Sequence, residues 1–125
     1  SLEQLRDNTD YMMDFKPLDR REQQAIEEVC QVFKSMNLIP CTACRYCEAG
    51  CPRHIHIPDL FAVMNGRQIY KDWNGEFYYG VHTIQGGKAS DCVKCGKCEE
   101  ICPQHLPIRD LMAQVAEIFD KKKED

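Results

Sequence analysis

The sequence predicts an all-α domain in which two cysteine-rich loops are related by an internal repeat. Apolar residues recur at spacings of three and four in several segments, which is the period of an amphipathic helix. No segment shows the alternation of polar and apolar residues that is typical of a half-buried strand. The two loops carry the same cysteine spacing, so we expect a pseudo-two-fold arrangement of two similar halves.

Composition limits the class of protein. The chain has 125 residues, a formal net charge of -4 and 43% hydrophobic residues, which suits one folded domain and argues against disorder. The mildly acidic net charge does not suggest a nucleic-acid-binding protein. The apolar runs are too short to span a membrane. The first residues are polar and charged, unlike a signal peptide, so we expect a cytoplasmic protein.

Two helices are expected before the first cysteine loop. Ser1 and Gln4 form a capping-box pattern that opens a helix over 1–13, and the pattern breaks before Pro17. A second capping box, Asp19 with Glu22, opens a helix that ends near residue 37. The apolar stripe of this second helix consists of Ala25, Ile26, Val29, Cys30, Phe33 and Met36.

Three further helices are expected after the first loop. One covers 58–66, with Pro58 at its first position and a glycine at its end. The second covers 74–84 and is stopped by the glycine pair that follows it. The last covers 108–119, and the lysine run at 121–123 suits its C-terminus.

Each cysteine loop reads C-x2-C-x2-C-x3-C-P, a run that is tied to [4Fe–4S] clusters. The first loop contains Cys41, Cys44, Cys47 and Cys51, and the second contains Cys92, Cys95, Cys98 and Cys102. Cysteines three apart in a curled loop can surround one cube, and the curl aims backbone N–H groups at its negative charge. The fourth cysteine comes one residue later in phase, so it tends to point away and to serve the other loop's cluster.

We therefore predict two [4Fe–4S] clusters with exchanged ligands. The first set is Cys41, Cys44, Cys47 and Cys102, and the second is Cys92, Cys95, Cys98 and Cys51. Such an exchange ties the halves together and couples cluster assembly to folding.

Other readings of the cysteines fit the sequence less well. Zinc sites also use C-x2-C pairs, but they usually stop at two pairs. Disulfides belong to exported, loop-rich small domains, and this chain is helix-patterned with no export signal. A [3Fe–4S] cluster would be expected if the second ligand of a motif were replaced, yet Cys44 and Cys95 are both present.

Residues around the motifs have simple structural interpretations. Cys30 is expected to be a buried, inert thiol. His54 and His105 are expected to serve packing or backbone hydrogen bonding rather than proton transfer, and Asp59 and Asp110 to be first-turn helix acids. Tyr46 and Ile101 are expected to shield the clusters. Three cations near the motifs either raise the reduction potential, steer a partner or are simply solvated: Arg45, Lys94 and Lys97. An aromatic stretch forms either core packing or a docking surface, and it consists of Tyr70, Trp73, Phe77, Tyr78 and Tyr79.

The motifs on a helical background resemble the alpha-helical ferredoxin domains. A closer resemblance is to the C-terminal region of iron–sulfur aldo/keto reductases of bacteria, mostly anaerobes; it is carried by IPCTACRYC, CPRHIHIPDLF and KASDCVKCGKCEEICPQHLPIRDLM. The opening SLEQLRDN resembles the last barrel helix of those enzymes. The resemblance implies a barrel remnant over 1–16, a connecting helix over 17–40 and the two-cluster ferredoxin domain over 41–125, with repeat halves at about 41–61 and 92–112.

The resemblance implies a parent oxidoreductase that is NAD(P)-dependent and whose catalytic residues lie in an upstream barrel. This sequence itself contains no recognisable catalytic site. The expected partners are that barrel and a redox carrier protein. Electron transfer is the favoured function, although a nicotinamide delivers two electrons as a hydride and no flavin motif is present to divide them. The alternative is a structural or oxygen-sensing iron–sulfur module without a role in electron transfer.

Overall fold

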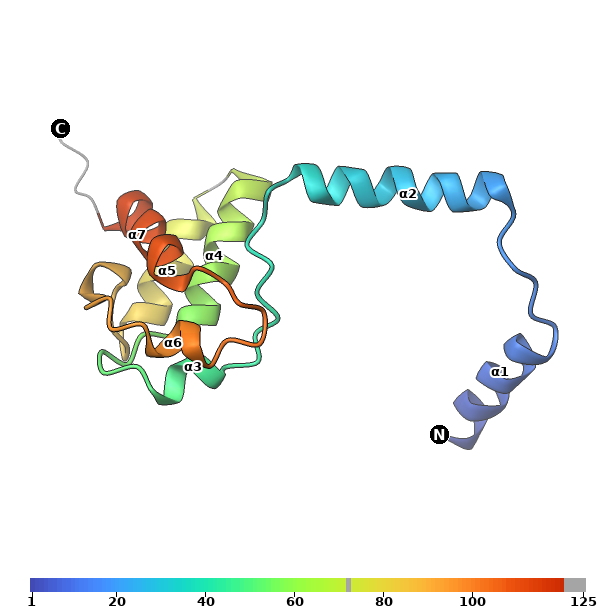
Figure 1. The fold of residues 1–125 in the computed structure, drawn as a ribbon, viewed down its shortest axis with the longest axis horizontal. Coiled ribbons are helices and arrows are strands. Elements are labelled where there is room, and N and C mark those ends of the chain that lie inside the picture. Colours follow the sequence, from blue (N-terminus) through green and yellow to red (C-terminus); the bar gives the residue numbers. More distant parts are fainter. Residues whose placement is uncertain (72, 121–125) are drawn as a thin grey trace. The chain divides into compact units, whose positions relative to one another are not determined.

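The computed structural model describes residues 1–71 and 73–120, and every regular element in these ranges is a helix (Figure 1). The absence of strands from the described residues confirms the all-α prediction. The chain divides into two compact units, Ser1–Asn37 and Leu38–Asp125. No helix of the described ranges has both the length and the apolarity needed to cross a bilayer.

The first unit contains α1 (Leu2–Met13) and α2 (Arg20–Ser35), and both begin as predicted. The Ser1 hydroxyl accepts a hydrogen bond from the Gln4 backbone at 3.3 Å, and the Gln4 side chain accepts one from the Ser1 amino group at 2.8 Å. Asp19 and Glu22 exchange the equivalent pair of bonds, both at 2.9 Å. These reciprocal bonds satisfy backbone donors that the first turn of a helix leaves free.

The apolar face of α2 is uncovered within its own unit. Ile26, Val29 and Phe33 are 50%, 54% and 63% exposed. Cys30 on the same face is exposed as well, so the expectation of a buried thiol is wrong. The period of the sequence identified the face correctly, but a stripe of this kind does not reveal whether another element packs on it.

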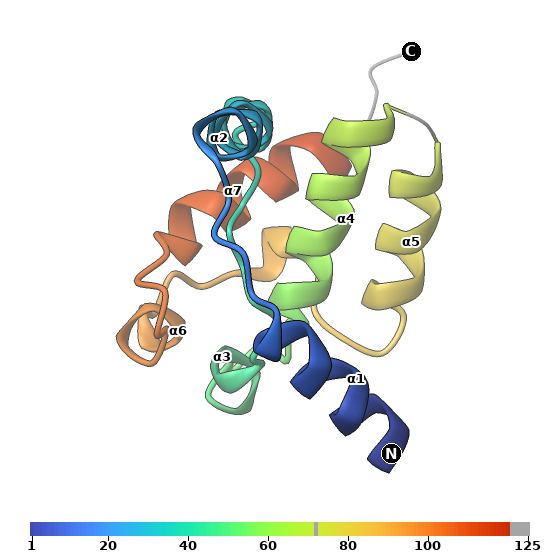
Figure 2. The same ribbon diagram turned by 90° about the vertical axis from the view of Figure 1, so that its right-hand side faces the viewer.

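The second unit is built on three longer helices, α4 (Ile57–Tyr70), α5 (Asn74–Thr83) and α7 (Ile108–Phe119). Helix α4 packs against both α5 and α7, and α4 and α5 run side by side in Figure 2. Three short elements complete it: α3 (Tyr46–Ala49), α6 (Lys97–Glu100) and the 3-10 turn η1 (Ala89–Asp91). Helices α3 and α6 contact each other, and η1 contacts α7.

The core of this unit lies between α4 and α7. Leu60, Phe61 and Val115 have no exposed surface, and Ile108 and Met112 are at most 2% exposed. Burying a side chain of this size contributes about 1.5–3 kcal/mol. The repeat is visible here, because the shift that places Cys92 over Cys41 also places Ile108 over Ile57 and Met112 over Phe61, all of them buried.

The repeat extends to the backbone. Helices α3 and α6 occupy equivalent positions, and α4 and α7 begin at equivalent residues. Three equivalent pairs of residues adopt left-handed backbone angles: Ala43 (φ 53°) and Lys94 (φ 54°), Arg45 (φ 64°) and Gly96 (φ 84°), and His54 and His105 (both φ 51°). Two segments of different sequence therefore follow the same path, which confirms the pseudo-two-fold repeat.

Two helix ends differ from the prediction. Helix α4 does not stop at Gly66 but continues to Tyr70, and Lys71 ends it with a left-handed φ of 54°. The cost of a glycine inside a helix, about 1 kcal/mol, is small beside the packing of α4 on two other helices. Helix α5 ends at Thr83, before the glycine pair that was expected to stop it. The lysine run at 121–123 lies outside the described residues.

The glycine pair has a different role, because it lets the chain pass close to the segment that follows Cys51. A side chain on Gly86 would meet the His54 carbonyl oxygen at 2.9 Å, and one on Gly87 would overlap the Arg53 carbonyl and Ile55. The Gly87 amide donates a hydrogen bond to the His54 carbonyl at 3.2 Å. The chain that enters the second cysteine loop is thus held against the exit of the first.

Only one member of the aromatic stretch packs in the core. Tyr79 is 5% exposed, whereas Tyr70, Trp73, Phe77 and Tyr78 are between 51% and 73% exposed. Core packing is therefore the wrong interpretation for four of the five. Tyr79 stacks on Phe119 with ring centroids 4.7 Å apart, which joins α5 to α7.

Candidate metal centres

Both cysteine loops are curled by left-handed residues. In the first loop Ala43 and Arg45 flank Cys44, and Lys94 and Gly96 flank Cys95 in the second. Such angles cost of order 1–3 kcal/mol for a residue other than glycine and persist only where the surrounding structure enforces them. After each curl, the short helix α3 or α6 carries the third cysteine, Cys47 or Cys98. The curl therefore lets cysteines three apart face one point.

The first loop surrounds a small cavity together with one cysteine from the second loop. Its sulfur-bearing lining consists of Cys41, Cys44, Cys47 and Cys102. Apolar side chains, including Phe61 and Leu106, complete the wall.

The second loop surrounds a cavity of similar size. Its sulfur-bearing lining consists of Cys92, Cys95, Cys98 and Cys51. Ile57 and Ile108 line both cavities, so their side chains lie between the two spaces. Each cavity thus brings together three cysteines of one motif and the fourth cysteine of the other.

The cysteines of each cavity differ in burial in the same way. Cys47 is buried and Cys98 half-buried on the inner side, whereas Cys44 and Cys95 at the tips of the loops are exposed. Burial raises the pKa of both inner thiols, Cys47 and Cys98, to about 11. Metals bind the thiolate, so loading either cavity must release protons from these buried groups.

A family model described as a 4Fe–4S dicluster domain matches residues 40–106, which include all eight motif cysteines. The chain belongs to the 4Fe–4S dicluster domain family. No curated protein and no solved structure matched the chain. The helical structure, with no strand among the described residues, fits an alpha-helical ferredoxin-like fold. Membership makes this an iron–sulfur, electron-transfer domain that binds 4Fe–4S.

The donor sets of the dicluster domain suit such a cofactor. A cubane cluster takes four thiolates, and each cavity presents four cysteines and apolar wall residues. No histidine and no carboxylate of the described residues lines either cavity. The donors are therefore the soft sulfur ligands that favour iron–sulfur clusters.

Arginine–carboxylate pairs hold the outer side of each loop of the dicluster domain, but they come from different places. In the first half Arg45 donates to Glu48 at 2.9 Å and to both oxygens of Asp59 at 2.7 and 3.1 Å. These hydrogen bonds from Arg45 lower the pKa of the Asp59 carboxyl. Asp59 is thus a first-turn acid of α4, as expected, and also ties that helix to the first loop.

The second half replaces this bridge with a direct cap on α7. Glu99 accepts hydrogen bonds from the Arg109 backbone and from its guanidinium Nε, both at 2.8 Å. These bonds lower the pKa of the Glu99 carboxyl, with the side-chain bond the larger cause. The equivalent of Arg109 in the first half is Pro58, which has no N–H to offer Glu48. The sequence shows the equivalence of Glu48 and Glu99 but not their different partners.

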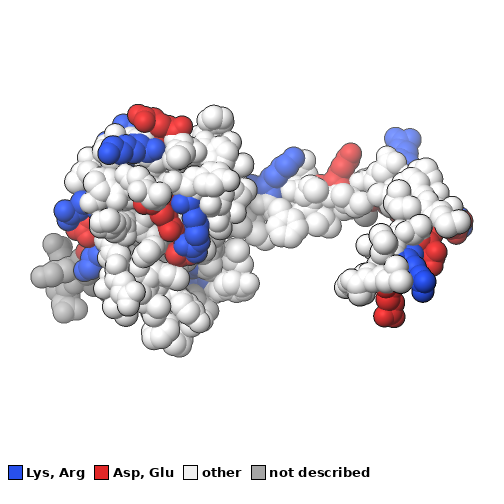
Figure 3. Space-filling view, turned by 90° about the horizontal axis from the view of Figure 1, so that it is seen from below, with Lys and Arg blue, Asp and Glu red and all other residues white. Residues whose placement is uncertain are grey.

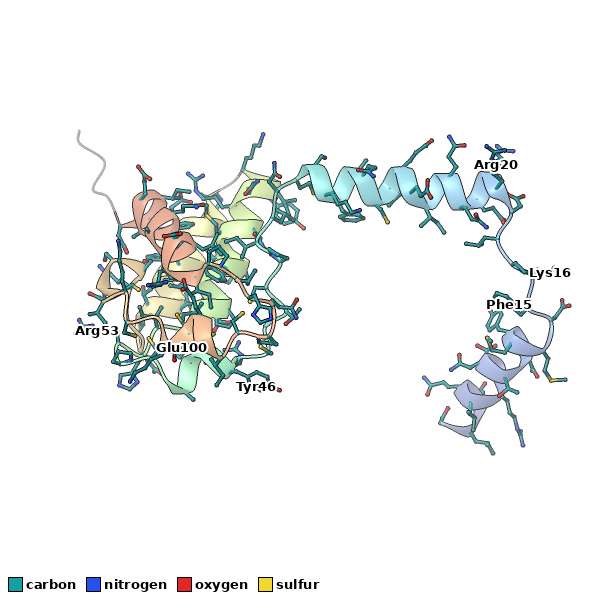
Figure 4. The ribbon with its side chains drawn as sticks, viewed as in Figure 1. Phe15, Lys16, Arg20, Tyr46, Arg53 and Glu100 are labelled. Atoms are coloured by element: carbon teal, nitrogen blue, oxygen red, sulfur yellow. The ribbon has the colours of Figure 1, made fainter. Side chains whose placement is uncertain are left out.

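The two equivalent histidines of the dicluster domain act through the backbone. The His54 and His105 amides donate to the carbonyls of Cys51 and Cys102, both at 3.1 Å, and both side chains are exposed. This agrees with the backbone role that was expected. Tyr46 lines the first cavity but is 59% exposed and points outward (Figure 4), while Ile101 is exposed and lines neither cavity.

Tyr79 anchors the segment that leads into the second loop, a role the sequence did not reveal. Its hydroxyl donates to Asp120 at 2.7 Å and accepts from the buried Ala89 amide at 2.9 Å. Asp120 also accepts from the Ser90 amide at 2.9 Å. The turn η1 just before Cys92 is therefore held by Tyr79 in the middle of α5 and by Asp120 at the end of α7. A sequence signal for this network is lacking, because its members come from three separate segments.

Proposed function

We propose that this domain holds two [4Fe–4S] clusters on exchanged ligand sets and carries single electrons. The first set would be Cys41, Cys44, Cys47 and Cys102, and the second Cys92, Cys95, Cys98 and Cys51. The observation that carries the proposal is the lining of the two cavities, because each contains three cysteines of one loop and the fourth of the other. When bound, the clusters would supply two adjacent one-electron redox centres.

The chain's own residues would divide the work by position. Ile57 and Ile108 are 3% and 2% exposed, so they would keep water out of the space between the two sites. Cys44 and Cys95 are exposed and would form the edges nearest to an outside donor or acceptor. The buried Cys47 and the half-buried Cys98 would hold each site to the core.

Iron content tests the number of sites and the exchange of ligands together. Anaerobic reconstitution should give about eight irons and eight sulfides per chain. The double variant Cys44→Ala with Cys102→Ala removes two ligands from one proposed set, so about four irons should remain. The double variant Cys44→Ala with Cys51→Ala removes one ligand from each set, so both sites should be depleted.

The reverse pattern in the two double variants would show that each loop serves only its own site. The matched control is Cys30→Ala, because Cys30 lies outside both motifs and lines neither cavity. It should retain the iron of the unmodified protein. A colourless preparation that contains zinc would refute the iron–sulfur assignment.

We further propose that the chain is the C-terminal part of a cytoplasmic bacterial oxidoreductase of the aldo/keto reductase type. The support is the resemblance of the segments around both motifs and of the opening SLEQLRDN. Residues 1–16 would then belong to an upstream barrel, 17–40 would connect, and 41–125 would form the ferredoxin domain. The barrel would be the partner within the chain, and a redox carrier protein the partner outside it.

The longer protein gives a direct test of this parentage. Its coding sequence should contain a nicotinamide-binding barrel before residue 1. Under anaerobic conditions, NAD(P)H should transfer electrons to the iron–sulfur sites when a flavin-containing carrier is present to divide the hydride into single electrons. A coding sequence without such a barrel would refute the parentage and leave the electron-transfer proposal intact.

The alternative function is a structural or oxygen-sensing module, and one observation favours it. Both cavities lie beside the core of the second unit, since Phe61 and Met112 are core residues and also line them. Iron–sulfur sites in this position would stabilise the fold. Reversible one-electron reduction followed by EPR distinguishes the two functions, because a purely structural module would not cycle.

A further inference from the structure

The two cavities present the same thiols but different charges. Three cationic side chains line the second cavity, namely Arg53, Lys94 and Arg109. The shift of 51 residues that places Cys92 over Cys41 pairs these three with uncharged residues, namely Gln104, Ala43 and Pro58. The only cation of the described residues that lines the first cavity is Arg45, and its equivalent in the second half is Gly96.

Neighbouring carboxylates compensate the two sides unequally. At the first cavity, Arg45 is shared by Glu48 and Asp59, so one cation faces two carboxylates. At the second cavity, Arg109 is paired with Glu99, and Arg53 lies 3.8 Å from Asp91.

Lys94 is the difference that remains. It has no ion pair with any described residue, whereas the other two cations of the second cavity are each paired with a carboxylate. On the face of the second unit shown in Figure 3, basic and acidic side chains lie next to one another, so the imbalance concerns these few residues and not a broad patch. Helix α6 adds Lys97 and Glu100, whose charges cancel.

We propose that the site formed by Cys51, Cys92, Cys95 and Cys98 has the higher reduction potential of the two, and that Lys94 is the main cause. This rests on the proposed function, because it requires both sites to be filled. A fixed positive charge stabilises the state that carries one more electron, and it does so most where water is scarce. A single electron from a one-electron donor is therefore held first at the second site, and an electron that enters at the first site moves downhill to the second.

The repeat itself supplies the matched variants. Lys94→Ala installs the residue of the first half, and Ala43→Lys makes the reverse change. Both positions are exposed and have nearly the same left-handed φ, 54° at Lys94 and 53° at Ala43. The backbone strain is therefore similar at the two positions. Arg53→Gln likewise installs the residue found at the equivalent position 104.

The test is an EPR-monitored redox titration of the anaerobically reconstituted chain, with dithionite as the one-electron donor. Two reduction steps are expected, one for each site. At any one potential, the ratio of reduced to oxidised sites should differ about tenfold between the two sites, which corresponds to a gap of about 59 mV between their one-electron reduction potentials. Lys94→Ala should lower this ratio for the upper step alone, by about threefold, the effect of one charge across a partly solvated gap. Arg53→Gln should lower the same step, and Ala43→Lys should raise the lower step alone.

The outcomes separate this inference from the function on which it rests. A chain with about eight irons whose steps coincide, or whose lower step moves in Lys94→Ala, would overturn the ordering while leaving the two-site function in place. A chain that binds no iron would overturn both. The double variant Lys94→Ala with Ala43→Lys should narrow the gap between the steps, and an unchanged gap would also refute the assignment to these charges.

Discussion

The hydroxyl of Tyr79 is predicted to stabilise the approach to the second cysteine loop, and Tyr79→Phe tests it by removing one oxygen atom. That oxygen makes two hydrogen bonds, to Asp120 at 2.7 Å and from the Ala89 amide at 2.9 Å. Ala89 is 2% exposed, so its N–H would be left without a partner in a site that water does not reach. An unsatisfied buried donor costs about 1–3 kcal/mol, and the bond to Asp120 adds about 1 kcal/mol. We expect a loss of about 2–4 kcal/mol in the free energy of unfolding.

Anaerobic guanidinium unfolding of the reconstituted chain, followed by circular dichroism, measures this loss. Tyr78→Phe is the matched control, because Tyr78 is the neighbouring residue on α5 and is 51% exposed. It should change the stability by no more than about 0.5 kcal/mol. Hydrogen exchange should localise the effect of Tyr79→Phe to η1 and the segment leading to Cys92. A loss below about 0.5 kcal/mol, equal to that of the control, would show that the reasoning from this network is incorrect.

Three further predictions concern the packing around the sites. Gly87→Ala should destabilise the chain by about 2 kcal/mol in chemical unfolding, because a methyl group there overlaps the Arg53 carbonyl. The control Gly80→Ala on α5 has open space around it and should be neutral or stabilising. Equal effects of the two substitutions would contradict the close approach of Gly87 to Arg53. Phe61→Ala should cost about 3–5 kcal/mol, since Phe61 is fully buried and lines the first cavity, while Phe77→Ala, at 55% exposed, should cost far less in the same unfolding assay. Removal of iron by an anaerobic chelator should raise hydrogen exchange in both cysteine loops and leave α2 unchanged, because α2 lies in a separate compact unit; loss of protection in α2 would argue against that independence.

Local signals in the sequence were sufficient for the helix starts. The capping boxes at Ser1 and Asp19 involve residues only three positions apart, so their chemistry is complete within one turn. The cysteine repeat also predicted two similar halves, and the left-handed residues at equivalent positions of the two loops show that the loops follow the same backbone path.

The far end of α4 could not be predicted from local signals because tertiary contacts decide it. The helix passes Gly66 and brings Arg67 to the ring of Phe119, 5.9 Å from its centroid, and to Glu76 at 3.3 Å. The buried Gly75 permits this approach, since a side chain on it would meet the Arg67 Cβ at 3.0 Å. A sequence window around Gly66 contains none of these partners.

The cysteines that line each cavity of the candidate site were predictable from the sequence, whereas the surroundings of the cavities were not. The spacing of the cysteines carries information on which sulfurs can reach one point, and the two cavities contain those two sets of four. The partners of Glu48 and Glu99 differ because Pro58 and Arg109 occupy equivalent helix positions, and that difference becomes meaningful only when α4 and α7 are folded beside the loops.

The exchange of one cysteine between the two cavities has a consequence for the order of biosynthesis. During synthesis the first motif leaves the ribosome well before Cys102 is made. The other three cysteines of the first cavity are therefore present for a time without the fourth. A chain that stops anywhere between the motifs would strand Cys51 without the three thiols that line its cavity. On the proposed ligand sets, the two halves resemble each other in sequence but would not mature one at a time, and iron delivery would have to follow synthesis of both motifs.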